Sequence, residues 1–362
     1  MELDRLEGLC REAGLAALVA GSPHGFAYFT GERLETQVAI PDRLAFATRA
    51  PGALWVTVCA IEAGQLAGAG ASVAAYEEFA DRPEEVLARQ LVAAGLSGRV
   101  GYEAAWMPAS VLEGLRRALA GHHLELVPAD ALFGRLWAVK SPDEIAHLER
   151  GAKATVAAIG ASFTPGHGSE VDVAIDLASG ILRGGAEAMA FMILASGPRA
   201  LVGHPVPSPA PLRDGDVIRT DVGGRFGNYL SDLARTGVIG RGSPAVYEMY
   251  GRLADMHDRI LGRVRPGVPA RQLLLESEAL AEAAGLPFSR HLVGHNIGIL
   301  VHEWPILNAF EEAPLEAGMV LCIEHGAGTG EFRLHIENTG VVTADGFRLF
   351  TQACPWDAPL QL

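Results

Sequence analysis

Hydrophobic and polar residues alternate in short, regular segments along the first 135 residues. A helical period covers residues 2–13, and the apolar run 15–20 that follows ends at a turn, which predicts a helix and then a strand. Short apolar runs predict further strands at 44–47, 53–59, 72–76, 99–103 and 124–127, and proline in the first turn marks helices at 83–94 and 108–120. These elements predict an α/β domain. We find no catalytic constellation in it, and expect His24, His122 and His123 at the surface or in loops.

A second domain is predicted to begin at residue 137. Ser141 is a suitable N-cap, Pro142 takes the first helical position and Glu144 completes a capping box, so a helix is expected over 142–163. The pattern then predicts a strand at 190–194 and helices at 171–183, 245–264 and 270–284. Because 362 residues are many for one hydrophobic core, we expect two domains, 1–136 and 137–362.

Strand-forming residues flank a glycine-rich stretch in the segment 216–237, which predicts a β-hairpin. A turn centred on Phe226 and Gly227 would place Asp221 directly opposite Asp232, with Cβ atoms about 5 Å apart. Two ionised carboxylates this close repel each other unless a cation lies between them. Taken alone, the pair is also compatible with a solvated acidic hairpin.

A second hairpin is predicted near the end of the chain. Two apolar segments, 319–324 and 332–338, flank a turn near Gly330, which would place Glu324 opposite Glu337. Taken singly, a glutamate at a strand end is usually a solvated residue. Two hairpins would together present four carboxylates.

Three histidines lie between the hairpins. His295 and His302 occur in the segments GHNIG and VHEWP, and His291 lies four residues before His295. A histidine beside glycine is more often a hydrogen-bonded loop residue than a ligand. Glu303 is expected to be structural or to support a metal ligand from behind, because the HExxH spacing of zinc peptidases is absent.

Charge and cysteine content narrow the functional classes. A net charge of −14 argues against nucleic acid or an anionic membrane as a partner, and no apolar run reaches the roughly 18 residues of a membrane span. The four cysteines form no CxxC pair or Cys/His cluster, and the first residues do not resemble a secretion signal. We therefore expect a cytoplasmic protein.

The candidate ligands are mainly hard oxygen donors. Four carboxylates and one imidazole suit two divalent ions such as Mn²⁺, with Co²⁺, Zn²⁺ or Fe²⁺ as alternatives. Two such ions lie roughly 3.5 to 4 Å apart and lower the pKa of a shared water, which gives a nucleophile at neutral pH. The spacing of these carboxylates and the histidine, taken together, thus favours a metal-dependent hydrolase.

From about residue 139 onward, the chain resembles the pita-bread metallopeptidases, the family of Xaa-Pro aminopeptidase, prolidase and methionine aminopeptidase. The resemblance is carried by SGPRALVGHPVPS, GDVIRTDVGGRFGNYLSDLARTGVIG, HLVGHNIGILVHEWP, GMVLCIEHG and the region around HIEN. The first domain resembles the creatinase-type N-terminal domain of the Xaa-Pro branch. The resemblance implies five metal ligands, which fall on Asp221, Asp232, His295, Glu324 and Glu337. The resemblance implies that Asp232 and Glu337 bridge both ions. It also implies that Glu324 carries a proton from the bridging water to the leaving nitrogen, and that His204, His291 and His302 hold the substrate carbonyl.

The chain departs from the pattern of this family at three places. HIEN, with His335 and Asn338, replaces an RIED-like string, GHN replaces GHG, and HEWPIL lacks an arginine that often follows the proline. In the family these arginines gate or anchor the peptide. Arg333, Arg199 or a first-domain residue of a second subunit are candidate substitutes, so the departures bear on proline specificity.

The resemblance implies a dinuclear Xaa-Pro peptidase, of aminopeptidase P or dipeptidase type, that cleaves the bond before proline with a hydroxide bridging the metals. Its substrate would be a small peptide with proline at the second position, and the protein would be a homodimer. Alternatives on the same fold are a metal-dependent hydrolase or lyase of an osmolyte or other small amide, a metal-free amidinohydrolase, and a non-catalytic binding protein. Loss of ligand residues would favour the last two, and no ligand is substituted.

Overall fold

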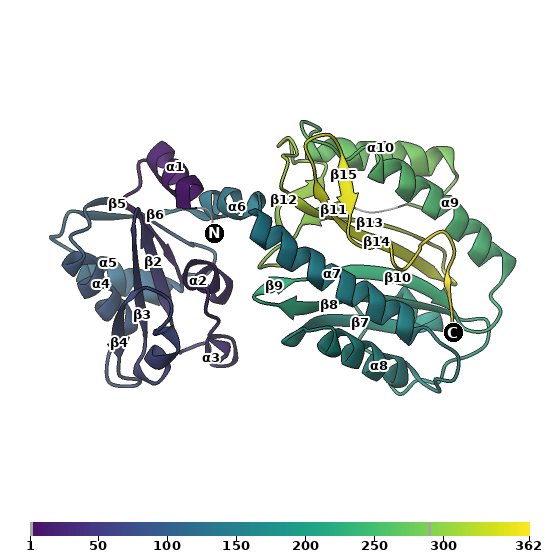
Figure 1. Cartoon of the computed structure of the whole chain (residues 1–362), viewed down its shortest axis with the longest axis horizontal. Helices are drawn as coiled ribbons and strands as arrows, with labels where there is room; N and C mark the ends of the chain where they lie inside the picture. Colours follow the sequence, from purple (N-terminus) through teal and green to yellow (C-terminus); the bar gives the residue numbers. More distant parts are fainter. Residues whose placement is uncertain (1–2, 289–290) are drawn as a thin grey trace. The chain divides into compact units, whose positions relative to one another are not determined.

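The computed structural model describes residues 3–288 and 291–362 and divides into two compact units, Met1–Leu136 and Trp137–Leu362 (Figure 1). Glu2, the predicted first residue of the N-terminal helix, lies outside the described residues. No helix in the described part of the chain combines the length and the apolar character needed to cross a membrane.

The first unit is built on a mixed six-stranded sheet in the order β4-β3-β2-β1-β5-β6. Its strands are β1 (Ala17–Ala20), β2 (Phe46–Ala50), β3 (Ala53–Cys59), β4 (Ser72–Tyr76), β5 (Gly98–Tyr102) and β6 (Leu124–Pro128). Its helices are α1 (Leu3–Ala13), α2 (Pro23–Thr30), α3 (Glu35–Ala39), η1 (Ala60–Leu66), α4 (Pro83–Ala93), α5 (Ala109–Ala118) and α6 (Asp130–Ala138). The predicted α/β architecture is confirmed.

Two local predictions for the first unit need correction. The strand expected at 44–47 begins two residues later, as β2. The segment after β1 is the helix α2, in which Ser22 accepts a capping hydrogen bond from the backbone of Gly25. His24 is therefore buried in a helix, with its ring 4.7 Å from that of Trp106, and is not a surface residue.

The described residues of the second unit form two five-stranded sheets and four α-helices. One sheet has the order β16-β10-β8-β7 with β9 paired to β8, and the other has the order β12-β11-β13-β14-β15. Helices α7 and α8 pack against the first sheet, and α9 and α10 against the second (Figure 1). The bounds are α7 (Pro142–Ser162), α8 (Glu170–Arg183), β7 (Ala188–Ser196), η2 (Gly197–Leu201), β8 (Val217–Phe226), β9 (Tyr229–Leu230), β10 (Leu233–Val238), α9 (Pro244–Leu261), α10 (Ala270–Ala283), β11 (Leu292–Asn296), β12 (Glu303–Asn308), β13 (Val320–Gly328), β14 (Arg333–Val342), β15 (Phe347–Leu349) and β16 (Leu360–Gln361).

The capping box predicted for α7 is present. The Ser141 side chain accepts a hydrogen bond from the Glu144 amide, and the Glu144 carboxylate accepts one from the Ser141 amide. These bonds satisfy two donors at a helix start that would otherwise lack intrahelical partners. The sequence therefore predicts the position of this helix to within one residue at its end.

The two sheets of the second unit meet along β10 and β14. The Thr236 hydroxyl of β10 donates to the His335 carbonyl and accepts from the His335 amide, at 2.9 and 2.8 Å. Thr339 of β14 donates to the Asp232 carbonyl at 2.7 Å. These bonds fix the strands that carry the candidate ligands relative to each other.

Candidate metal centre

The first hairpin forms with a register that differs from the predicted one. Gly227 and Asn228 take the turn, with φ of 58° and 72°, as a two-residue turn of the type I′ class requires. This turn pairs Asp221 with Ala234, so the direct pairing of Asp221 with Asp232 is wrong. Because side chains alternate with a period of two, Asp232 stays on the side of the hairpin that faces Asp221.

The second hairpin has the predicted register. β13 and β14 pair Glu324 directly with Glu337, and the pairing continues without a break from Val320 to Gly328. Both glutamates are buried, with exposed fractions of 7% and 2%. They are not the solvated glutamates that usually end strands.

The two hairpins and β11 bring four of the candidate ligands together, namely Asp221, Asp232, His295 and Glu337. Among the described residues, Glu324 belongs to neither group of ligand atoms, and its Oε2 lies 3.0 Å from His335 Nε2. His295 Nε2 lies 3.6 Å from Asp232 Oδ2 and 3.9 Å from Glu337 Oε1, which is too far for a hydrogen bond. The ligand atoms of Asp232, His295 and Glu337 lie within 4.8 Å of one another, as do those of a second group that contains Asp221 and Glu337. Glu337 belongs to both groups, which is the position of a shared ligand.

The electrostatics of this cluster favour a cation. The pKa of Asp232 is raised well above its usual value, first by burial and then by the negative charges of Glu337, Asp221 and Glu324. Asp232 Oδ1 is buried and accepts no hydrogen bond from the described residues. Burial and the neighbouring His302 lower the pKa of His295 to about 4, so its imidazole is neutral at pH 7 and has a lone pair to donate.

The cluster faces a cavity of about 1010 Å³ in the second unit. All three accessory histidines, His204, His291 and His302, line it, and the His302 ring lies 4.1 Å from that of His295. Arg333 also lines this cavity. Arg199, the other candidate from this unit for the family's arginines, instead pairs with Glu170 at 3.2 Å.

Two residues that were not predicted as ligands from the sequence, His335 and Cys322, also belong to this cluster. His335 groups with Asp221 and Glu337, and Cys322 with Asp232 and Glu337. Burial and the nearby carboxylates raise the pKa of the Cys322 thiol well above its usual value, and this thiol contacts the Asp232 carbonyl and the Thr339 hydroxyl. For His335 a signal was present, because it lies two residues before Glu337 and residues at that spacing share a strand face.

Asn338 is on the opposite face of β14 and has a structural role. Its side-chain oxygen accepts from Arg235 at 2.9 Å and from Thr351 at 2.7 Å. Arg235 is fully buried and also donates to the Glu337 carbonyl. Where the family has the acid of RIED, this chain therefore offers Arg235 the neutral side-chain amide of Asn338 as an acceptor. Arg235 in turn holds the backbone of Glu337.

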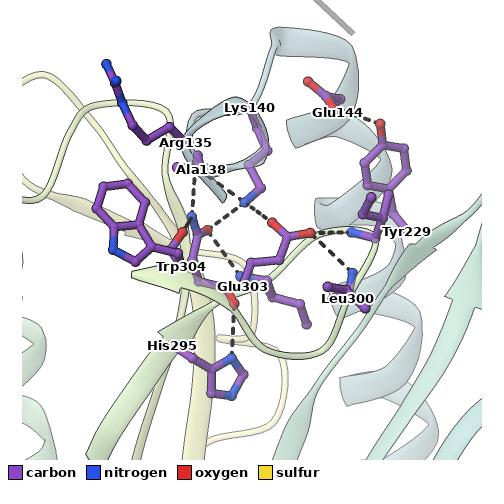
Figure 2. A network of polar contacts seen from close by, with 12 residues as sticks. Arg135, Ala138, Lys140, Glu144, Tyr229, His295, Leu300, Glu303 and Trp304 are labelled. Atoms are coloured by element: carbon purple, nitrogen blue, oxygen red, sulfur yellow. Dashed lines mark hydrogen bonds and ion pairs between the residues drawn. The ribbon is translucent and has the colours of Figure 1, made fainter. Parts of the chain in front are cut away.

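A buried ion pair supports the segment that carries His295 and His302 (Figure 2). Lys140 Nζ lies 2.8 Å from Glu303 Oε2 and donates to Asn296 Oδ1 at 2.6 Å. The other oxygen of Glu303 accepts from the backbone amides of Ile299 and Leu300. The side-chain nitrogen of Asn296, Nδ2, donates to the backbone carbonyls of Ala138 and Trp304. Glu303 is thus structural, as predicted.

The same segment orients the imidazole of His295. Its Nδ1 lies 3.2 Å from the Asn296 carbonyl oxygen, which can only accept, so Nδ1 carries the proton (Figure 2). Nε2 is then the unprotonated nitrogen, and it faces Asp232 and Glu337. A backbone acceptor of this kind is common behind histidine ligands.

Gly294 is required for the close approach of β11 to β13. It has φ of 152°, and a Cβ at this position would collide with the Cys322 carbonyl oxygen. We expect Gly294→Ala to destabilise the second unit by about 1–3 kcal/mol and to weaken metal retention, because β11 must move and His295 moves with it. Guanidinium titration and elemental analysis would measure both effects. Gly330→Ala is the control, because a Cβ there meets open space, and equal effects of the two changes would contradict this account.

Comparison with known proteins agrees with this geometry. Residues 145–344 match metallopeptidase family M24, and residues 2–139 match the creatinase/prolidase N-terminal domain. The chain is 32% identical over 343 residues to the probable dipeptidase PepE of Mycobacterium tuberculosis, covering 92% of this chain and 89% of that protein. It is 31% identical over 235 residues to the Xaa-Pro dipeptidase of Pyrococcus furiosus, covering 63% and 67% of the two chains.

The three-dimensional comparison extends over nearly the whole chain. The crystal structure of dipeptidase PepE from Mycobacterium ulcerans matches with a TM-score of 0.84 and 30% identity, covering 99% of this chain and 97% of that one. The predicted creatinase-like N-terminal domain and pita-bread catalytic domain are both confirmed. The chain is therefore a peptidase that belongs to metallopeptidase family M24.

Proposed function

We propose that this protein is a dinuclear metal-dependent Xaa-Pro peptidase that hydrolyses the bond before proline in small peptides. The observation that carries the proposal is the convergence of two acidic hairpins and His295 on one cavity. Similarity to the Xaa-Pro dipeptidase of Pyrococcus furiosus supports the choice of substrate.

The donor set fits two divalent ions. Asp221, Asp232, His295, Glu324 and Glu337 would hold them, and four carboxylates would balance the charge of two dications. The grouping of the ligand atoms supports Glu337 as a shared ligand, and the family resemblance implies that Asp232 is shared as well. Mn²⁺ suits such oxygen-rich ligands, with Co²⁺, Zn²⁺ or Fe²⁺ as alternatives. When bound, the ions would supply Lewis-acid polarisation of the peptide carbonyl and an activated water.

The other residues of the cavity would bind the peptide and move the proton. Glu324 would carry the proton to the leaving nitrogen of proline. His204, His291 and His302 would contact the substrate carbonyl, and Arg333 would bind the carboxylate of a dipeptide. Phe191, Leu292 and Leu300 line the same cavity and offer apolar contacts to the proline ring.

A substrate panel tests this proposal. The protein would be stripped with a chelator, reloaded with Mn²⁺ or Co²⁺, and assayed with Ala-Pro, Ala-Ala and Xaa-Pro-Xaa peptides. We expect turnover of the proline peptides and little turnover of Ala-Ala. Metal-loaded protein that hydrolyses none of them would refute the peptide assignment and favour a small non-peptide substrate.

His302→Ala separates substrate contacts from metal binding. Removal of one group that stabilises a developing oxyanion typically lowers kcat by about 100- to 1000-fold. We expect a loss in this range, with both ions still bound, because His302 belongs to neither ligand group. Steady-state kinetics and metal analysis would measure the two quantities. Loss of an ion in this variant would show that His302 acts through the metal site.

A further inference from the structure

We infer that His335 is a sixth protein ligand of the metal centre and gives the second metal position an imidazole of its own. This inference rests on the proposed dinuclear site. At this position the Xaa-Pro branch usually has arginine, which cannot donate a lone pair to a metal. The substitution therefore adds a donor to this chain.

The backbone of β14 aims His335 at the cluster. Both backbone polar groups of His335 bond to the Thr236 hydroxyl of β10, which fixes the strand at this point. Side chains two residues apart share one strand face, so His335 lies on the face of Glu337, the shared ligand. The His335 side chain is 4% exposed, and the residue lines the cavity.

The contacts of the His335 ring assign different tasks to its two nitrogens. Nε2 lies 3.0 Å from Glu324 Oε2, which is hydrogen-bond distance. A proton on Nε2 makes this contact a hydrogen bond to the carboxylate and leaves the lone pair on Nδ1. Nδ1 lies 3.8 Å from Asp221 Oδ2, beyond hydrogen-bond distance.

The 3.8 Å between His335 Nδ1 and Asp221 Oδ2 fits two ligands of one ion. Nitrogen and oxygen donors lie about 2.0 to 2.2 Å from a bound Zn²⁺, so two donors on the same ion lie up to roughly 4.2 Å apart. The contact of His295 with Asp232, at 3.6 Å, has the same character. Each candidate metal position therefore has one aspartate and one imidazole, with Glu337 common to both.

An imidazole at each position changes the expected metal preference. Carboxylate and water ligands suit Mn²⁺, whereas imidazole suits Zn²⁺ and Fe²⁺, and sites with nitrogen donors generally bind Mn²⁺ more weakly than Co²⁺. We expect His335 to raise affinity for Zn²⁺ and Co²⁺ more than affinity for Mn²⁺. Loss of His335 would then move the second position towards Mn²⁺.

X-ray absorption of the zinc- or cobalt-loaded protein tests this inference without an activity assay. Outer-shell scattering from imidazole counts the histidines bound per ion. Wild-type protein loaded with two ions is expected to have one imidazole per ion, and His335→Ala one imidazole per two ions. Calorimetric titration is expected to give a weaker second site in this variant, by at least about 10-fold for Co²⁺. His204→Ala is the control, because it removes an exposed imidazole of the same cavity outside both ligand groups.

The outcomes separate this inference from the proposed function. Two bound ions with only one imidazole per two ions in wild-type protein would overturn the ligand role and leave the dinuclear site intact. Unchanged Co²⁺ affinity in His335→Ala would overturn it as well. Wild-type protein that binds no ions would overturn the dinuclear proposal itself. The wild-type count alone is decisive, so the test does not depend on the folding of the variant.

Discussion

Asp232→Asn is expected to abolish metal loading and turnover while it stabilises the metal-free protein. The change keeps the size of the side chain but removes a negative charge from a buried cluster, where burial, and then the repulsion of Glu337, Asp221 and Glu324, raise the pKa of Asp232. The metal-free protein loses this repulsion, and its melting temperature should rise by roughly 2–4 °C per kcal/mol relieved. The metal-bound protein would lose one of its proposed ligands, and the rate should then fall at least about 100-fold.

The variant is expected to melt at a higher temperature than wild-type protein without metal but to gain less stability from metal, so melting curves distinguish the two effects. Melting curves with and without Mn²⁺ should show a metal-dependent increase in wild-type protein, because a ligand of the native state stabilises it, and a much smaller increase in the variant. Asp255→Asn is the control, because this aspartate is exposed on α9. A variant with normal activity and a normal metal-dependent increase would show that Asp232 is not a shared ligand.

Local sequence signals predicted the elements of the fold where each signal has one structural solution. Ser141, Pro142 and Glu144 can cap only one helix start, and the structure has that helix. In the second hairpin the glycine-rich turn is short, and both strands are continuous, so Glu324 and Glu337 pair as expected. Such signals depend on contacts within a few residues.

The register of the first hairpin could not be predicted from local signals. Its glycine-rich middle allows more than one turn, and the register depends on which two residues adopt positive φ. Gly227 and Asn228 do so, which moved the partner of Asp221 from Asp232 to Ala234. The site survives this shift, because a displacement of two residues keeps side chains on the same face.

Long-range polar contacts could not be predicted from the sequence. Lys140 and Glu303 lie 163 residues apart, and neither has a local pattern that indicates burial. Their pairing depends on the packing of the start of α7 beside the loop between β11 and β12. The resemblance to a family supplied ligand positions but not these supporting contacts.

Lys140→Met is expected to lower the free energy of unfolding by about 3–5 kcal/mol. The Lys140 and Glu303 side chains are 2% and 1% exposed, so removal of the ammonium leaves a buried carboxylate without its counter-ion. The side-chain oxygen of Asn296 also loses one donor and keeps the Ile297 backbone amide. Guanidinium titration followed by tryptophan fluorescence would measure the loss.

A second change tests whether the buried charge causes this loss. In Lys140→Met/Glu303→Gln, the glutamine oxygen can still accept from the Ile299 and Leu300 amides, and no unpaired charge remains. The double variant should therefore be more stable than Lys140→Met alone. Lys153→Met is the control, because the Lys153 side chain that pairs with Glu149 is 59% exposed, and pairs of exposed lysines contribute about 0–1 kcal/mol. Equal losses in the two single lysine variants would mean that the ion pair does not support the segment between His295 and His302, and its position would then depend on apolar packing.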